Sequence, residues 1–187
     1  MQLRQQVKKW LTRTLGLRAE MPLSFYALDV LFRRLLRQNA GVRWAVHHTS
    51  TIRSPHRLVV GQGCFPGDSP GVYINADNGI HIGDFTNLGP QVGLISANHD
   101  AVNNVGHVAA APLRIGRFCW LGMGAVVLPG VELGDFTIVG AGAVVTRSFP
   151  AGHCVVAGNP ARLLKHLNQD ECHAQAQRRY EQHAAGQ

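Results

Sequence analysis

Residues 115–144 read, in units of six, IGRFCW LGMGAV VLPGVE LGDFTI VGAGAV. Each unit opens with an aliphatic residue, glycine follows it in four of the five units, and the fifth position is small or β-branched. A unit of this length holds one short flat strand and one turn. The aliphatic residue fills an interior, and glycine lets the chain bend where a Cβ atom would be crowded. The repeat therefore predicts a stack of short strands.

Three such units close a triangular coil, and stacked coils hydrogen-bond as parallel strands, each contacting only its neighbours. The same six-residue repeat is present upstream between Ile82 and Leu94, and we expect it to continue downstream through Ala151 and Ala157. The chain is therefore predicted to be mainly β, with a parallel β-helix over residues 46–162.

The repeat is interrupted between Leu94 and Ile115. These residues are 21 positions apart, which is three and a half units, so the two runs are out of phase by half a unit. Residues 98–112 between them are polar, contain glycine and alanine, and show no repeat. We expect them to leave the coil as an extruded loop.

The segments outside the repeat read as helices. Residues 1–45 are predicted to form a basic amphipathic arm of two helices, because apolar residues show helical spacing over residues 3–15 and again over residues 25–36. In the second helix the broad apolar side is opposed by Arg33 and Arg37. After the repeat ends, residues 163–187 are predicted to be a polar helical tail.

The net charge of +7 is concentrated at one end of the chain. Residues 1–40 hold eight Lys and Arg against two acidic residues, whereas residues 41–187 hold ten against nine. Residues 41–187 therefore lack the extended basic surface that binds a nucleic-acid backbone, so we expect no nucleic-acid partner. Two roles remain open for the arm: it caps the β-helix, or it makes a peripheral contact with a membrane surface or a lipid-linked substrate.

The cysteines favour a reducing compartment. Cys64, Cys119, Cys154 and Cys172 contain no CxxC pair and follow no secretory segment, so we expect reduced thiols in a cytoplasmic protein. No apolar run approaches the roughly 20 residues that a membrane span needs. The histidines show no metal-ligand spacing, so no metal is expected.

The repeat, followed by AGNPAR at residues 157–162, resembles the hexapeptide-repeat acyltransferases, in particular the maltose and galactoside O-acetyltransferase branch. The likeness is specific over about residues 72–165 and does not cover the first 45. It implies a left-handed parallel β-helix, acetyl-CoA as co-substrate and a homotrimer. The handedness comes from the resemblance, because the general crossover rule favours right-handed connections.

The resemblance places a catalytic histidine where the repeat breaks into the extruded loop, and His99 occupies that position. A neutral imidazole, with an ordinary pKa near 6.5, can take the proton of an alcohol that attacks a thioester. Asp77 matches an acceptor-binding aspartate and would contact the acceptor hydroxyl or orient His99, and Asn75 is a second substrate-binding candidate. Asp100 is not given the orienting role, because adjacent side chains in an extended segment point apart.

The resemblance also marks a groove for coenzyme A. Trp120 matches an aromatic residue that lies along the pantetheine arm, and Arg162 matches a basic residue that meets the 3′-phosphate. Backbone N–H groups around Gly122 and Met123 are expected to hold the oxyanion that the mechanism requires. The full set of candidate coenzyme-binding residues is Trp120, Gly122, Met123, Gly140, Ala141, Thr146, Arg147, Arg162 and Lys165.

The sequence thus predicts a coenzyme A-dependent O-acetyltransferase that moves an acetyl group to a hydroxyl of a sugar, or of a polysaccharide or nucleotide-sugar precursor. Direct attack is expected, because no Ser or Cys motif suggests a covalent intermediate on the enzyme. Two alternatives come from other classes. A non-catalytic β-helix scaffold needs neither loop nor coenzyme groove, and a γ-type carbonic anhydrase-like zinc enzyme needs three histidines gathered on the metal.

Overall fold

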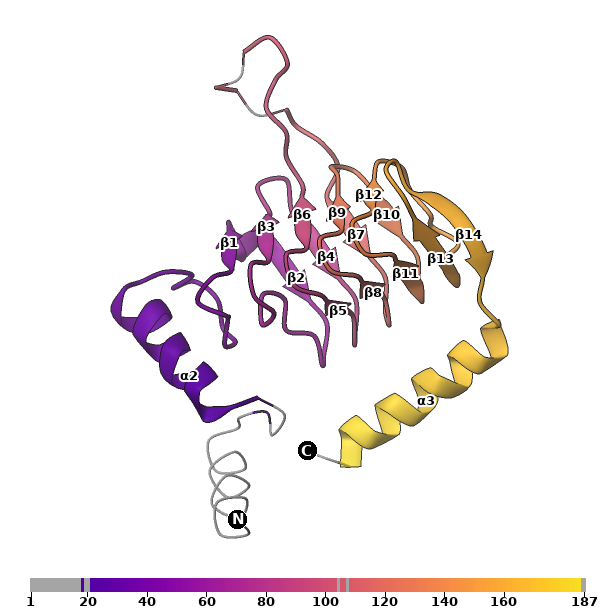
Figure 1. Ribbon diagram of the computed structural model, residues 1–187, viewed down its shortest axis with the longest axis horizontal. Helices are drawn as coiled ribbons and strands as arrows, with labels where there is room; N and C mark the ends of the chain where they lie inside the picture. The colour runs from indigo at the N-terminus through magenta and orange to yellow at the C-terminus, as the bar shows by residue number, and fades with distance from the viewer. Residues whose placement is uncertain (1–17, 19–20, 104, 107, 186–187) are drawn as a thin grey trace.

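A computed structural model describes residue 18 and residues 21–103, 105–106 and 108–185 of the chain. Its body is a left-handed parallel β-helix whose three sides are sheets (Figure 1). Sheet A contains β1 (Thr51–Arg53), β3 (Tyr73–Asn75), β6 (Gly93–Ile95), β9 (Val126–Val127) and β12 (Val144–Val145). Sheet B contains β2 (Leu58–Val60), β4 (Ile80–Ile82), β7 (Leu113–Ile115) and β10 (Glu132–Leu133). Sheet C contains β5 (Asn87–Leu88), β8 (Trp120–Leu121), β11 (Thr137–Val139), β13 (Cys154–Ala157) and β14 (Arg162–His166).

The chain visits sheets A, B and C in turn, so each coil contributes one strand or turn to every side. Neighbouring strands pair in parallel, with the exception of β14, which runs antiparallel to β13 at the edge of sheet C. A short 3-10 helix, η2 (Pro55–Arg57), joins β1 to β2 in the first coil. The predicted mainly β fold with stacked coils is confirmed.

The core is built from the residues that open each six-residue unit. Six successive openers have at most 3% of their surface exposed; they are Ile115, Leu121, Val127, Leu133, Val139 and Val145. The small or β-branched fifth residues are buried to the same degree; they are Cys119, Ala125, Val131, Thr137 and Ala143. The periodicity thus identified both sets of interior positions.

The expected continuation of the interior positions to Ala151 and Ala157 is wrong. Pairing in sheet C advances by 18 residues from Leu121 to Val139 but by 17 residues from Val139 to Val156. Because the last coil is one residue shorter, Val156 fills the core, while Ala151 is exposed and Ala157 is half-buried.

Glycine in the second position of a unit has a steric cause, for which Gly116 is a clear example. A Cβ atom on Gly116 would lie 2.5 Å from the backbone nitrogen of Asp135 in the next coil. Backbone cannot move aside as a flexible side chain can, so only glycine fits where successive coils pass this closely.

The interruption of the repeat is a long excursion between β6 and β7, at the corner between sheets A and B. Figure 1 shows this segment projecting well beyond the coils. Residues 104 and 107 within it are outside the described residues. The excursion therefore leaves the stacking of the coils on either side intact, since β4 and β7 still pair in register.

The arm is described at residue 18 and from residue 21 onward, and the predicted helix over residues 3–15 lies outside the described residues. The second helix consists of α2 (Leu23–Asp29) followed by a π-helical segment, η1 (Val30–Leu35). Its buried residues are Phe25 and Asp29, while the leucines of the predicted apolar side are exposed. Arg33 lies opposite these leucines, as the pattern predicts, but it is on the packed side, where it pairs with the buried Asp29. Of the two roles left open for the arm, capping of the body through these leucines is therefore not what the structure shows.

The tail differs from the prediction in a similar way. Residues 162–166 form the strand β14, and the helix α3 (Gln169–Ala185) begins only after it. Figure 1 shows α3 running back beneath the coils from the end of β14. Among the described residues, no helix has the length and apolar character needed to cross a bilayer.

A column of rings explains why α3 packs there. Successive coils carry an aromatic ring at the corner between sheets B and C, each on a residue with positive φ: Phe85, Phe118, Phe136 and His153. Neighbouring rings stack with centroids 4.9–5.3 Å apart. The ring of Tyr180 on α3 meets two of them edge-on, and its hydroxyl donates to Asp84 Oδ2 at 2.9 Å. A mostly polar helix is thus held by a few aromatic contacts.

Candidate active site

The candidate site lies at the corner between sheets A and B. Arg53, Asn75 and Ile95 are in register across β1, β3 and β6. The residues that follow these strands therefore stack at one corner, although they are far apart in the sequence. This register places the turn that contains Asp77 beside the start of the excursion that carries His99.

Asp77 is held by groups from the preceding coil. The hydroxyl of Ser54 donates to Asp77 Oδ1 at 2.5 Å, and Arg53 Nη2 lies 3.7 Å from Oδ2. Arg57 donates to the backbone carbonyl oxygen of Asp77. These contacts fix the carboxylate against a hydroxyl and a cation, so Asp77 has a defined position at the corner.

Asn75, the second substrate-binding candidate, is buried, and its side-chain oxygen accepts a hydrogen bond from the backbone N–H of Asp77 at 3.0 Å. This oxygen shapes the turn. The structure therefore gives Asn75 a contact that orders the Asp77 backbone, and a role in substrate binding stays a prediction.

Asn78, which the sequence did not single out, connects this turn to both ends of the loop. Its amide nitrogen Nδ2 donates to the carbonyl oxygens of Ser96 at 3.0 Å and of Val108 at 2.9 Å. The backbone N–H of Asn78 donates to Ser96 Oγ at 2.9 Å. The signal in the sequence was weak, because Asn in an Asp-Asn-Gly segment is also an ordinary turn residue.

The base of the loop is a short hairpin around His99. The backbone N–H of Val108 donates to Asn98 O, and that of Asp100 donates to Gly106 O, each at 2.9 Å. His99 lies between the two bonded residues and is exposed. Because the residues on either side are hydrogen-bonded, the imidazole is carried on an ordered base at the edge of the Asp77 corner.

Asp100 serves the loop itself. Its Oδ1 accepts backbone hydrogen bonds from Asn103 at 2.7 Å and from Val102 at 2.8 Å. These bonds from Asn103 and Val102 hold the pKa of Asp100 below its ordinary value. The carboxylate of Asp100 therefore stabilises the turn of the loop.

The candidate coenzyme-binding residues fall into separate groups. Trp120 lies on sheet C in register with Asn87 and Ile138, and 45% of its side chain is exposed. Four candidates occupy the next corner, between sheets C and A; they are the small residues Gly122, Gly140 and Ala141 and the exposed Met123. Thr146 and Arg147 follow β12, at the corner that His99 also occupies. Within one chain, then, Trp120 and His99 are not brought onto the same side.

The proposed oxyanion role does not hold for the amide of Gly122. Its backbone N–H donates to Val139 O at 2.8 Å, which is one of the bonds that stack the coils. That hydrogen is therefore engaged and not directed toward a substrate. Gly122 keeps a steric function, because a Cβ atom there would lie 2.7 Å from the backbone nitrogen of Ala141.

The basic candidates are exposed and carry no carboxylate partner in the described part of the chain. Arg147 lies with its guanidinium carbon 5.3 Å from the ring centroid of Phe149. Arg162 Nη1 donates to Ala161 O at 3.1 Å, and Lys165 lies three residues further along β14. Their charges are thus available to a phosphate group.

Burial makes the cysteines poor nucleophiles. The four thiols are free and buried, and burial raises the pKa of Cys64 and of Cys119 to about 12. A thiol needs its thiolate form to attack, so neither is activated. Within the described residues, no three His, Cys, Asp or Glu side chains lie close enough to hold a metal ion.

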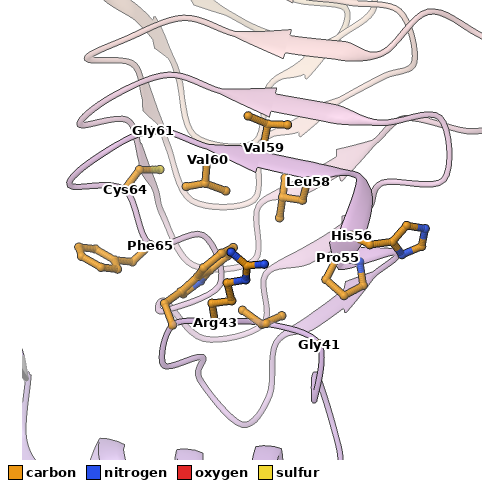
Figure 2. A pocket seen from close by; sticks show the side chains of 12 residues that line it. Gly41, Arg43, Pro55, His56, Leu58, Val59, Val60, Gly61, Cys64 and Phe65 are labelled. Atoms are coloured by element: carbon orange, nitrogen blue, oxygen red, sulfur yellow. The ribbon is translucent and has the colours of Figure 1, made fainter.

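A hollow of about 540 Å³ lies at the N-terminal end of the β-helix (Figure 2). In Figure 2, β2 supplies Leu58, Val59 and Val60, with His56 at one end and Phe65 at the other. His99 is not part of its lining. This hollow is therefore separate from the loop histidine.

Comparison with known proteins agrees with this architecture. The family model described as bacterial transferase hexapeptide (six repeats) matches residues 112–147. The chain contains the hexapeptide repeat of the bacterial transferases. The resemblance found in the sequence is confirmed, because the same repeat is matched and the similar structures are acetyltransferases.

Two solved structures and one curated protein illustrate how far the similarity of this hexapeptide-repeat chain extends. A maltose O-acetyltransferase from Clostridium difficile 630 is 30% identical with a TM-score of 0.57, covering 64% of each chain. A galactoside acetyltransferase in complex with coenzyme A is 26% identical with a TM-score of 0.58, covering 68% of this chain and 64% of that one. Nodulation protein L of Rhizobium meliloti (strain 1021) is 45% identical over 55 residues, which are 28% of this chain and 30% of that protein. The chain spans less than half the length of the curated relatives it matches.

Proposed function

We propose that this hexapeptide-repeat protein is an acetyl-CoA-dependent O-acetyltransferase that acts on a sugar hydroxyl. The observation that carries the proposal is the loop histidine: His99 is exposed on an ordered hairpin that leaves a hexapeptide coil beside a fixed aspartate. The similar maltose and galactoside enzymes are named as acetyltransferases, and one of them is in complex with coenzyme A. Their names also favour a carbohydrate acceptor.

In the proposed reaction, a ring nitrogen of neutral His99 accepts the proton of the acceptor hydroxyl while that oxygen attacks the thioester carbonyl carbon. The C–S bond then breaks, and the imidazolium returns the proton to the departing thiolate. Asp77, held by Ser54 and Arg53, would receive a hydrogen bond from the acceptor or fix the imidazole. No enzyme-bound acyl group is needed, which is consistent with the buried, protonated cysteines.

The proposed assembly is a homotrimer. The outward side chains of sheet A are mainly apolar; they include Tyr73, Ile95, Val126 and Val144. Sheet C presents the apolar Trp120, Ile138 and Val155, together with the polar Asn87 on β5. Sheet B instead presents His81, Arg114 and Glu132.

Two apolar sides on one prism favour a head-to-tail contact, with sheet A of one copy against sheet C of the next. Three such contacts close a ring when each turns the chain by a third of a circle. It would bring the corner of His99 toward Trp120 of the neighbouring copy. This arrangement supports a site shared between subunits, because one chain alone separates the two residues. Light scattering that gives a 20.3 kDa monomer would contradict the trimer.

A cytoplasmic location is part of the same proposal, and the four free thiols support it. The acceptor is tested by following release of free thiol from acetyl-CoA with a panel of sugars, phosphorylated sugars and nucleotide sugars. We expect coenzyme A binding in the micromolar range and turnover with at least one carbohydrate. Absence of any coenzyme A binding by calorimetry would favour the scaffold alternative.

A further inference from the structure

The exposed side of the arm is unusually apolar. Between Leu23 and Leu36, six large apolar side chains are exposed to at least 38%: Leu23 43%, Leu28 38%, Val30 55%, Leu31 41%, Leu35 71% and Leu36 59%. Figure 1 shows α2 at the N-terminal end of the coils, with one side away from them. Large apolar side chains exposed together on one short helical segment mark an interaction site.

This side cannot turn inward, because the opposite side is fixed to the body. Asp29 is 3% exposed, and its Oδ1 accepts a hydrogen bond from the backbone N–H of Val46 at 2.9 Å. Arg33 donates to both carboxylate oxygens of Asp29, at 2.8 and 2.6 Å, and to Val42 O at 3.0 Å. Rotation of the helix would leave a buried carboxylate unpaired, which is costly.

The charges beside the leucines have one sign. Between Glu20 and Asp68 the chain contains one acidic residue, the buried and paired Asp29. Arg34, Arg37 and Arg43 border a shallow hollow of about 440 Å³ at the end of η1. None of these three arginines forms an ion pair within the described residues. We call Leu28, Leu31, Leu35 and Leu36, together with these three arginines, the arm face.

We propose that the arm face binds the surface of an anionic phospholipid bilayer. Leucines of an interfacial helix insert at the boundary between headgroups and acyl chains, and arginines bind lipid phosphates. A second copy of the chain is a poor occupant, because a symmetric contact would bring Arg34, Arg37 and Arg43 against the same three charges. The proposal does not depend on the acetyltransferase reaction, and it selects one of the two roles that the sequence left open for the arm.

The test is co-sedimentation of the full chain with vesicles of phosphatidylglycerol and phosphatidylcholine, compared with phosphatidylcholine alone. We expect binding to the anionic vesicles that weakens at least tenfold between about 0.1 M and 0.5 M salt. Leu31→Asp with Leu35→Asp should abolish it. Its matched control is Leu163→Asp with Leu164→Asp on β14, because the side chains are exposed to similar degrees, 43% and 65% against 41% and 71%.

The arginines are tested by charge reversal. Arg37→Glu should weaken vesicle binding about thirtyfold, since each charge near an anionic surface contributes about a fivefold change and reversal changes two. Arg178→Glu, on the exposed side of α3, makes the same change in net charge and should weaken binding only a few fold. Circular dichroism and light scattering confirm that each variant keeps the fold and assembly of the parent protein.

Three outcomes would overturn the proposal. The first is that the full chain does not bind anionic vesicles. The second is that the Leu31 and Leu35 variant binds them as well as its control does. The third is that this variant changes the oligomeric mass, which would show that another copy covers the arm face. Deletion of residues 1–17 gives a further check. If the deletion abolishes vesicle binding while the Leu31 and Leu35 variant still binds, the contact belongs to the N-terminal residues and not to the arm face.

Discussion

The clearest consequence of the corner geometry concerns Asn78, whose side chain connects the Asp77 turn to both ends of the loop. Asn78→Ala removes two hydrogen bonds, to Ser96 O at 3.0 Å and to Val108 O at 2.9 Å. Each such bond contributes about 0.5–1.5 kcal/mol net, so the loop base should lose about 1–3 kcal/mol. The population in which the base is open should rise roughly 5- to 150-fold, while the coils remain folded.

Hydrogen exchange measures this opening directly. The backbone N–H of Val108 and that of Asp100 close the hairpin through Asn98 O and Gly106 O, so both should exchange faster by that factor. Exchange in sheet C should not change. Turnover should fall with the fraction of ordered loop, because His99 sits between the two bonded residues.

Asn87→Ala is the matched control, because Asn87 is an exposed residue on β5 in sheet C, away from the loop. It should leave the exchange of the loop amides unchanged. If Asn78→Ala leaves the exchange of Val108 and Asp100 at the rate of the parent protein, the reasoning that this amide holds the base of the loop is refuted.

Three further predictions concern the coenzyme, the tail and the coils. Arg162→Ala should weaken coenzyme A about 10- to 100-fold and dephospho-coenzyme A much less, because a charge-assisted phosphate contact contributes about 1.5–3 kcal/mol; equal weakening in calorimetry would make Arg162 structural. Tyr180→Ala should lower the melting temperature by about 4–8 °C, since loss of the ring contacts and of the bond to Asp84 costs about 2 kcal/mol, and an unchanged transition would show that α3 does not stabilise the coils. Gly116→Ala should lower the free energy of unfolding in denaturant by about 3 kcal/mol or more, because its Cβ atom would meet backbone at 2.5 Å. Gly130→Ala, where space is open but φ is +71°, should lower it by about 1 kcal/mol, and equal losses would contradict the steric account.

The sequence predicted the coils well because the six-residue repeat is a local pattern with one physical cause in every unit. It failed at Ala157, where the last coil is one residue shorter and nothing local reports the shortening. The packed side of the arm was also missed. Periodicity shows that a helix has an apolar side, but here the buried contact is made by the Asp29 and Arg33 pair and the leucines are left outside.

The docking of α3 could not be read from the tail, because it depends on rings that are up to 95 residues away in the sequence, from Phe85 to Tyr180. At the candidate site, His99 was predicted because the resemblance places a histidine where the repeat breaks, and Asp77 because the resemblance places an aspartate at the matching position; their roles stay predictions. Asn78 was not found, since its role arises from contacts with two segments that meet only after folding. Trp120 remains apart from His99 in one chain, so the complete site is a property of the proposed assembly.

Acetyl transfer by a His99→Ala variant tests the proposed function most directly. Thiol release from acetyl-CoA is followed with the acceptor that the panel identifies, for the parent protein, for His99→Ala and for His81→Ala, whose imidazole lies on sheet B. The account predicts that His99→Ala lowers turnover about 10²- to 10⁴-fold, with coenzyme A affinity and oligomeric state unchanged, and that His81→Ala keeps parental turnover. Full activity of His99→Ala would contradict the account.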